Sequence, residues 1–388
     1  MKLLLAADIS VNYIENYNNE EILNNFKNVK PIFDNADFSV ANLECVLYDG
    51  NSKPILKSGP NIKGDPRFIE CLKYLNLDVA GLANNHLGDF GAEAAISTFN
   101  LLKENGISYI GAGENITEAY NFHIFEKDGL KVAIFAVCEN EFGIADHNKT
   151  GSAGFNLSRV IDTMKNAKEK ADKVIFYFHG GNEYNPFPSP NKVELYRLIA
   201  DLGADAIIAM HTHCPQGYEI HNGKPIVYSM GNFFFPYVKK GEKINRNSSW
   251  YFGYLTQLHI TKDNIELEVI PYRFGAIGED IEILSGKEKD NFIKYLKEIS
   301  EPITDIKRIK HLFNVWCAIS GVVYAPALNF STDMEKDGAE MCRGLKNALS
   351  CEAHNELLKT TLNLCYSNEL DKYKQLTEEV TRYQNIKL

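Results

Sequence analysis

The first 235 residues alternate between apolar runs of strand length and segments with a helical spacing of apolar residues. A short apolar run bounded by turn residues is typical of a fully buried strand, whereas recurrence at three and four residues is typical of an amphipathic helix. Helices are predicted at about 18–36, 65–77, 92–105 and 190–202. Buried strands are predicted at residues 2–7, 38–47, 79–83, 107–113, 131–138, 173–179, 206–210 and 225–235. This alternation predicts an α/β fold.

The pattern changes beyond residue 236. Residues 250–261 and 264–274 alternate apolar and polar positions around Asp263 and Asn264, which predicts an antiparallel hairpin. From about residue 287 the chain is rich in Lys and Glu with helical spacing. Since 388 residues exceed the usual size of one compact core, we expect a main domain at 1–286 and a helical C-terminal extension at 287–388.

Polar side chains that bind metals follow several of the predicted buried strands. The carboxyl ends of strands in an α/β sheet are where ligands and ions bind, so these side chains are candidates for one site. In His211-Thr212-His213, a strand's period of two would point both imidazoles to one side. One such pair, or one acid at a strand end, is often structural. The candidate metal ligands are Asp8, Glu44, Asn85, His179, His211 and His213.

Carboxylate, amide and imidazole groups without a thiolate form a hard to borderline ligand set, as a dinuclear hydrolytic centre requires. Such a set suits Mn, Fe or Zn. Two ions held about 3.5 to 4 Å apart would clamp an oxyanion and activate water, and Glu44 could bridge both ions. A metal-free α/β protein whose histidines are structural is the alternative that these residues leave open.

Loops next to the strand ends add candidate substrate contacts. Residues 50–64 are rich in Gly, Pro, Lys and Ser and are predicted to form a long surface loop that rims the site. Residues 180–190 cannot be helical and should project over the strand ends. We expect Glu183, Tyr184 and Asn232 to contact the substrate.

Charge and cysteine content exclude some functions. A net charge of -10 without any Lys/Arg-rich run disfavours nucleic acid as a partner. The eight cysteines are scattered and form no CxxC motif, which is typical of free thiols in a reducing compartment. The apolar run near the N-terminus is too short for a signal peptide, and no run has the length of a membrane span. A cytoplasmic location is therefore expected.

The order of these motifs resembles the CapA family of capsule and poly-γ-glutamate synthesis proteins, within the calcineurin-like metallophosphoesterases. The matching segments are AADIS, ADFSVANLE, GLANNHLGDFG, GAGEN, HGGNEYNPFPSP, GADAIIAMHTHCPQGYE and PIVYSMGNFFF, between residue 1 and about 236. The resemblance implies a four-layer α/β/β/α sandwich with the metal centre at one edge. It also implies two divalent ions, Mn, Fe or Zn.

The resemblance further implies individual roles. His179 and His211 match ligands of one metal, and His213 matches a ligand of the other. Asp8 matches the first aspartate, Glu44 the bridging acid and Asn85 the amide ligand. His86 matches the proton donor to the leaving group, oriented by Asp89 or Asn84. Because Ser10 replaces a histidine of the wider superfamily, one metal would be held by Asp8, Glu44 and His213 alone, and would be bound weakly.

Two functions follow from the resemblance. The first is a metal-dependent hydrolase in which metal-bound hydroxide attacks a phosphoester, or an amide bond of a γ-glutamyl or cell-envelope polymer. The second is a non-catalytic accessory protein that binds an anionic polymer during capsule synthesis, in a complex that could be membrane-associated. The sequence does not indicate an oligomeric state or a substrate.

Overall fold

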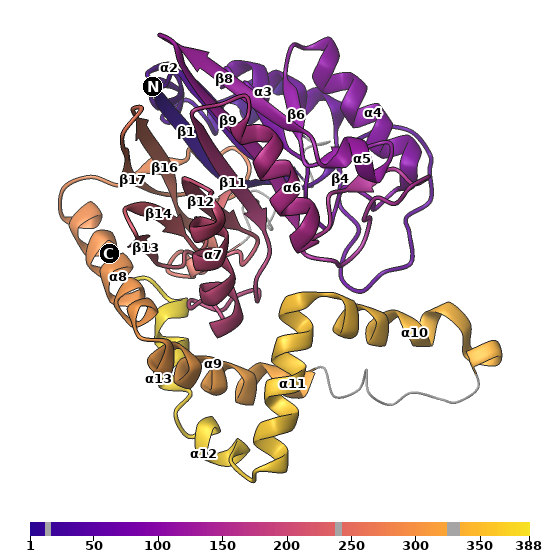
Figure 1. Ribbon diagram of the computed structural model, residues 1–388, viewed down its shortest axis with the longest axis vertical. Helices are drawn as coiled ribbons and strands as arrows, with labels where there is room; N and C mark the ends of the chain where they lie inside the picture. Colours follow the sequence, from indigo (N-terminus) through magenta and orange to yellow (C-terminus); the bar gives the residue numbers. More distant parts are fainter. Residues whose placement is uncertain (12–16, 237–242, 324–333) are drawn as a thin grey trace.

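The structure is a computed structural model that describes residues 1–11, 17–236, 243–323 and 334–388 (Figure 1). Its first sheet has eight strands in the order β18-β17-β16-β1-β2-β5-β6, and β15 also pairs with β1. The part of the sheet formed by β1, β15, β2, β5 and β6 is parallel. The other edge, formed by β16, β17 and β18, is antiparallel. The strands are β1 (Lys2–Ile9), β2 (Phe38–Leu43), β5 (Val79–Gly81), β6 (Ser108–Ile110), β15 (Asn232–Phe234), β16 (Phe252–Ile260), β17 (Ile265–Arg273) and β18 (Glu282–Ile283).

The second sheet has six strands in the order β13-β14-β12-β11-β9-β8. Strands β9, β11, β12 and β14 are parallel, and β8 and β13 are antiparallel to their neighbours. The strands are β8 (Phe122–Lys127), β9 (Leu130–Cys138), β11 (Lys173–His179), β12 (Ala206–Met210), β13 (Tyr218–His221) and β14 (Lys224–Val227). Both sheets are mixed, and the predicted hairpin of β16 and β17 is confirmed.

The two sheets pack against each other through side chains from their central strands. The Tyr177 hydroxyl on β11 donates a hydrogen bond of 2.5 Å to the Ala6 carbonyl on β1. A Cβ atom at Gly81 would lie 2.8 Å from the Tyr177 ring, so β5 needs glycine at this position. The apolar side chains of β1, including Leu3 and Leu5, are completely buried in this core. A continuous run of apolar residues is what burial on both faces of a sheet requires.

Helices contact these sheets from outside. Helix α6 (Leu157–Lys168) contacts β9 and β11, α7 (Pro190–Leu202) contacts β12 and β14, and α4 (Gly91–Glu104) contacts β6. The helix predicted at 18–36 is instead two short helices, because Phe26 between them turns into the core against Phe68 and Phe234. The remaining short elements are α1 (Asn19–Asn24), α2 (Lys30–Asp34), α3 (Ile69–Tyr74), α5 (Ile116–Ala119), β3 (Val46–Leu47), β4 (Lys63–Gly64), β7 (Ala112–Gly113) and β10 (Gly151–Ser152).

The C-terminal part is helical, as predicted. Its helices are α8 (Gly286–Ser300), α9 (Ile306–Ser320), α10 (Met334–Ser350), α11 (Glu352–Tyr366), α12 (Leu370–Lys374) and α13 (Glu378–Thr381). Figure 1 shows these orange and yellow helices along the edge of the molecule where α7 lies, and α9 contacts α7. The chain returns to the main body near its end, where the Ile386 amide donates to the Asn247 carbonyl at 2.6 Å. The division at 286/287 stays a prediction.

Within the described ranges, no helix is both long enough and apolar enough to cross a membrane. The predicted mixed α/β class, with two sheets and C-terminal helices, is confirmed.

Candidate metal centre

The predicted metal ligands come together where strands of both sheets end. Asp8 lies near the end of β1, Glu44 directly after β2, and Asn85 shortly after β5 in the first sheet. His179 ends β11 in the second sheet, and His211 and His213 follow β12. Each of these side chains is at least nine-tenths buried. Because both sheets place these carboxyl strand ends at one edge, residues up to 205 positions apart meet in one site.

Asp8 is fixed inside its strand rather than after it, since β1 extends two residues further than predicted. The register of β1 against β2 shifts between Ala6 and Asp8, and such an irregularity re-aims a side chain. The two carboxylate oxygens of Asp8 accept hydrogen bonds from the Asn42 side chain at 2.7 Å and from the His211 amide at 2.9 Å. Asn42 was not predicted, although it stands two residues before Glu44.

The His211-Thr212-His213 segment is not a continuation of strand β12, which ends at Met210. His211 has a φ of 96° and His213 a φ of 55°. This left-handed region is unfavourable for residues with a side chain and costs of order 1–3 kcal/mol for each. The predicted strand geometry is therefore wrong, because a strained turn, and not a period of two, brings both imidazoles into the site.

The ligand atoms form two groups that share one carboxylate. Glu44, His179 and His211 make one group, and Asp8, Glu44 and His213 make the other, with the atoms of each group within 4.8 Å of one another. His179 connects the groups, because its Nε2 lies 3.5 Å from Glu44 and its Nδ1 lies 3.4 Å from Asp8. Asn85 joins the first group through Oδ1, which lies 3.1 Å from His179 Nε2.

Several buried polar atoms of this site have no hydrogen-bond partner among the described residues. They are both carboxylate oxygens of Glu44, Nδ1 of His211 and the hydroxyl of Ser10. A buried carboxylate whose oxygens accept no hydrogen bond is unfavourable, and buried charges in proteins are normally hydrogen-bonded or bound to metals. The donor set and the unpaired atoms therefore fit divalent cations.

The carboxylates and histidines perturb one another. Burial lowers the pKa of His179, but Glu44 and Asp8 more than offset this effect and raise the pKa to about 10. Burial likewise opposes charge on His213, yet Glu44 and Glu183 raise its pKa. Burial and the neighbouring histidines lower the pKa of His211 well below its usual range. Without a cation, the site therefore holds protons on His179 that a metal would displace.

His86 lies beside these groups with its two ring nitrogens in different surroundings. Its Nδ1 lies 2.7 Å from Asp89, and its Nε2 lies 3.8 Å from Glu44. Asp89 is in turn paired with Lys57 at 2.5 Å, and both side chains are almost fully buried. The series of contacts from Lys57 through Asp89 to His86 orients the imidazole and leaves Nε2 on the side of the metal ligands.

Lys57 was missed by the sequence reasoning, which placed residues 50–64 on the surface. Its ammonium group also donates to the Asn85 carbonyl at 3.2 Å. Nothing in the local pattern marked it, since a lysine among Gly, Pro and Ser is usually solvated. Asn84 has a local role: its Oδ1 accepts from the amides of His86 and Leu87, and its Nδ2 donates to the Leu43 carbonyl.

The predicted substrate residues differ in position. Glu183 is exposed and groups with His211 and His213, and Tyr184 is 46% exposed. Asn232 is completely buried, and its amide is occupied by His213 Nδ1 at 2.8 Å and by the Trp250 carbonyl at 3.2 Å. These contacts indicate that Asn232 orients His213, and they leave its amide no free group for the predicted substrate contact. The Trp250 ring lies 4.8 Å from the His213 ring and was not predicted.

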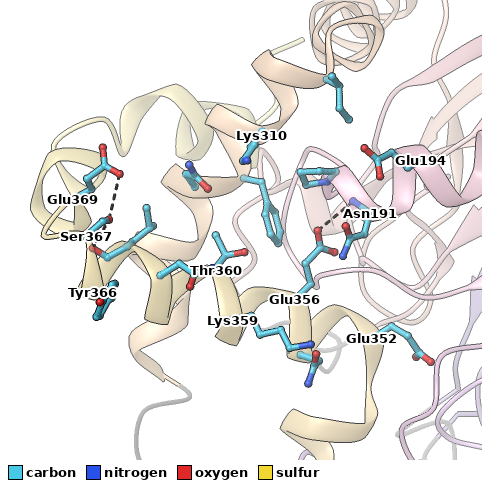
Figure 2. Close-up of a pocket in the computed structure, with 17 residues that line it drawn as sticks. Asn191, Glu194, Lys310, Glu352, Glu356, Lys359, Thr360, Tyr366, Ser367 and Glu369 are labelled. Atoms are coloured by element: carbon cyan, nitrogen blue, oxygen red, sulfur yellow. Dashed lines mark hydrogen bonds between the residues drawn. The ribbon is translucent and has the colours of Figure 1, made fainter.

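A separate pocket of about 830 Å³ lies between α7, α9 and α11 and contains none of the predicted metal ligands (Figure 2). Its wall carries side chains of both charges, including Glu194, Glu356, Lys310 and Lys359.

Comparisons with known proteins agree with the motifs. The chain is 31% identical over 218 residues to the capsule biosynthesis protein CapA of Bacillus anthracis, which covers 54% of this chain and 53% of that protein. It is 30% identical over 251 residues to the PGA biosynthesis protein CapA of Bacillus subtilis (strain 168), covering 63% and 64%. The chain thus matches less than two thirds of the length of either relative.

The fold is also similar to the crystal structure of a novel phosphatase from Mycoplasma pneumoniae, with 13% identity, a TM-score of 0.45, and coverage of 71% of this chain and 94% of that one. The family model described as bacterial capsule synthesis protein PGA_cap matches residues 5–237, more than half of the chain. The range includes every candidate ligand from Asp8 to His213, and the resemblance expected from the motifs is confirmed. The chain therefore belongs to the PGA_cap family of bacterial capsule synthesis proteins.

Proposed function

We propose that this protein is a dinuclear metal-dependent hydrolase of capsule or poly-γ-glutamate metabolism. The observation that supports it best is Glu44, whose two buried oxygens lack hydrogen-bond partners while the carboxylate belongs to both ligand groups. A carboxylate in this position is suited to bridging two cations. The proposal includes the four-layer metallophosphatase arrangement, a cytoplasmic location in keeping with eight free cysteines, and Mn, Fe or Zn as the metal.

The residues would divide between two ions. His179, His211 and Asn85 would hold one, Asp8 and His213 the other, and Glu44 both. When bound, the ions would supply positive charge for an anionic oxygen of the substrate and a nucleophile by lowering the pKa of water. Asn232 contacts His213 Nδ1 at 2.8 Å and orients this imidazole, so little reorganisation of His213 would be needed when an ion binds.

His86 would protonate the leaving group. Asp89 accepts from Nδ1 and thereby sets the ring orientation, so that a proton on Nε2 faces the cleft beside Glu44. Lys57 contacts Asp89 in a buried ion pair. Asp89, Lys57 and Asn84 are positioning residues in this scheme, since each acts through His86 or its turn.

The substrate would be an anionic phosphoester, or a γ-glutamyl amide in an envelope polymer. Family membership supports a role in capsule synthesis, and the cations would offset a net charge of -10 that otherwise repels anions. Glu183 and Tyr184 stand at the exposed rim, where they could contact a bound chain.

The test is a screen of phosphoesters and γ-glutamyl peptides with metal-loaded protein and its His86→Ala variant. We expect hydrolysis of one class, and a fall in kcat of about 10²–10⁴-fold in the variant at unchanged metal content. His221→Ala is the matched control, because this half-buried histidine pairs with Asp201 away from the centre. Equal turnover by wild type and His86→Ala would contradict the assigned proton donor.

A second candidate is a non-catalytic accessory protein that binds an anionic polymer in a synthesis complex. The burial of Asp8 and Glu44, which are 0% exposed, favours it. A polymer could contact the exposed Glu183 beside His211 and His213 without reaching these two carboxylates. This candidate predicts metal-dependent binding of poly-γ-glutamate without turnover. Unchanged polymer production in cells that carry His86→Ala would support it over the hydrolase.

A further inference from the structure

A second cluster of metal-binding side chains lies outside the dinuclear centre, where the C-terminal helices meet the main body. Glu141 is in the loop after β9, and Cys351 and His354 occupy the N-cap and first turn of α11. Their ligand atoms all lie within 4.8 Å of one another. None of these residues has a role in the proposed hydrolysis.

The arrangement has the dimensions of a tetrahedral site. His354 Nδ1 lies 3.6 Å from Glu141 Oε1, close to the roughly 3.3–3.8 Å that separates two ligands on one ion with bonds of about 2.0–2.3 Å. Cys351 and His354 are three positions apart at the start of one helix, so their side chains share a face. Since all three ligand atoms lie within 4.8 Å of one another, small side-chain movements would bring them to the distances that one ion requires.

Burial makes the cluster more than a surface contact. The Cys351 residue is 1% exposed, and the side chains of Glu141 and His354 are 7% and 12% exposed. Cys351 Sγ lies 3.3 Å from the carboxylate of Glu139, itself buried, so the thiol is embedded among acids.

The local charge balance favours a cation. Glu352 accepts from the Asn140 amide and side chain, and Glu356 accepts from Ser189 and Asn191. Figure 2 shows both glutamates on α11, with the bond from Asn191 to Glu356 dashed. Among the described residues, one lysine forms an ion pair with an acid of this region: Lys192 pairs with Glu139. One ammonium beside the buried Glu139 and the partly buried Glu141, Glu352 and Glu356 leaves a local excess of negative charge.

We propose that Glu141, Cys351 and His354 form a third cation site that selects zinc. One thiolate, one imidazole and one carboxylate, completed by water, are the ligand types of tetrahedral Zn²⁺. The ion joins α11 to the loop after β9. It also holds His354 in the wall of a pocket of about 190 Å³ that includes Glu183 and Tyr184, so the C-terminal helices border the rim of the dinuclear centre.

Cobalt substitution distinguishes this site from the dinuclear centre, whose ligands include no thiolate. The full-length protein in a Cys342→Ser/Cys365→Ser background, which removes the two more accessible thiols, is loaded with Co²⁺. We expect a thiolate-to-cobalt charge-transfer band in the near ultraviolet that titrates to one equivalent per chain. Added Cys351→Ser should abolish the band, Glu141→Gln should weaken cobalt binding about 10–100-fold, and His213→Ala should leave the band intact.

Zinc content provides the second measurement. Protein purified without chelator should lose one zinc per chain on Cys351→Ser, while the background variant keeps it. A background protein that binds cobalt without a thiolate band overturns the proposal, as does a band that survives Cys351→Ser. If Cys351→Ser does not fold, Glu141→Gln decides, because it retains the thiol and an uncharged isostere. None of these results depends on turnover, so failure of the hydrolase proposal would leave them unaffected.

Discussion

At the residue scale, the centre combines an unfavourable backbone conformation with buried polar atoms that lack hydrogen bonds. His211 and His213 adopt positive φ angles, and Glu44 keeps two buried oxygens without hydrogen bonds. Each feature costs free energy in the protein without metal, and a cation that binds both groups offsets part of that cost. Such local conflict is expected at functional sites.

His213→Ala should remove one of the two ions and leave the other. Its imidazole belongs to the group with Asp8 and Glu44, whereas Asn85, His179 and His211 would hold the other ion without it. Metal analysis of dialysed protein should give about half the wild-type content of Mn, Fe or Zn at the centre. Asn232→Ala, which removes only the orienting contact, should weaken this ion about 10–100-fold. Loss of both ions, or of neither, would contradict the division of ligands.

Metal uptake at the centre should depend on pH through His179. Its pKa of about 10 without metal means that it is protonated at neutral pH, and an ion can bind only the neutral imidazole. Apparent affinity should therefore rise with pH, by roughly tenfold per unit for each proton displaced. Calorimetric titrations between about pH 6 and about pH 8 in two buffers would count the protons. A pH-independent affinity would show that His179 is neutral or is not a ligand.

At the element scale, the loop at 50–64 shows how a segment without regular structure can complete a site. It was predicted on the surface, but it enters the interior far enough to bury Lys57 and to donate the Ile62 amide to Asp89 at 2.6 Å. The loop thereby fixes the turn that carries His86. Asp89 has two oxygens to satisfy inside the protein, and this loop supplies a partner for each.

Lys57→Met should destabilise the protein by about 3–5 kcal/mol, because Asp89 would remain as a buried charge without its counterion. Chemical denaturation followed by circular dichroism measures this loss. Lys53→Met is the control: Lys53 is exposed in the same loop, so its stability should change by less than about 0.5 kcal/mol. Equal stability of the two variants would mean that the ion pair in the structure contributes little.

At the scale of the whole molecule, the C-terminal helices pack onto the main body. Phe292 of α8 is fully buried and lies 6.3 Å from Phe252 of β16, and α11 contacts Asn140 and Ser189. The two hydrogen bonds of α11 join sequence positions 212 and 167 residues apart. The two predicted parts should therefore unfold together.

Phe292→Ala should cost about 3–5 kcal/mol and keep a single cooperative unfolding transition. Its neighbour Ile293 is 39% exposed on the same helix, so Ile293→Ala should have a much smaller effect. Fluorescence and circular dichroism should give coincident denaturation curves. Two separate transitions, with only the first shifted by Phe292→Ala, would instead indicate that residues 287–388 unfold independently.

The sequence determined the alternation of strands and helices, the hairpin after residue 250 and the family, because periodicity and motif order are properties of neighbouring residues. It also indicated which residue types end the strands. The tertiary structure placed the ends of β1, β2 and β5 beside those of β11 and β12, and Glu44, the expected bridging acid, in two ligand groups. Only the tertiary structure decided that a turn, and not strand β12, brings His211 and His213 into the site. The inward position of Lys57 and the proximity of Cys351 to Glu141 also depended on packing between distant segments. A local pattern indicates which apolar side chains are buried, but not which side chains they contact or which polar groups are buried with them.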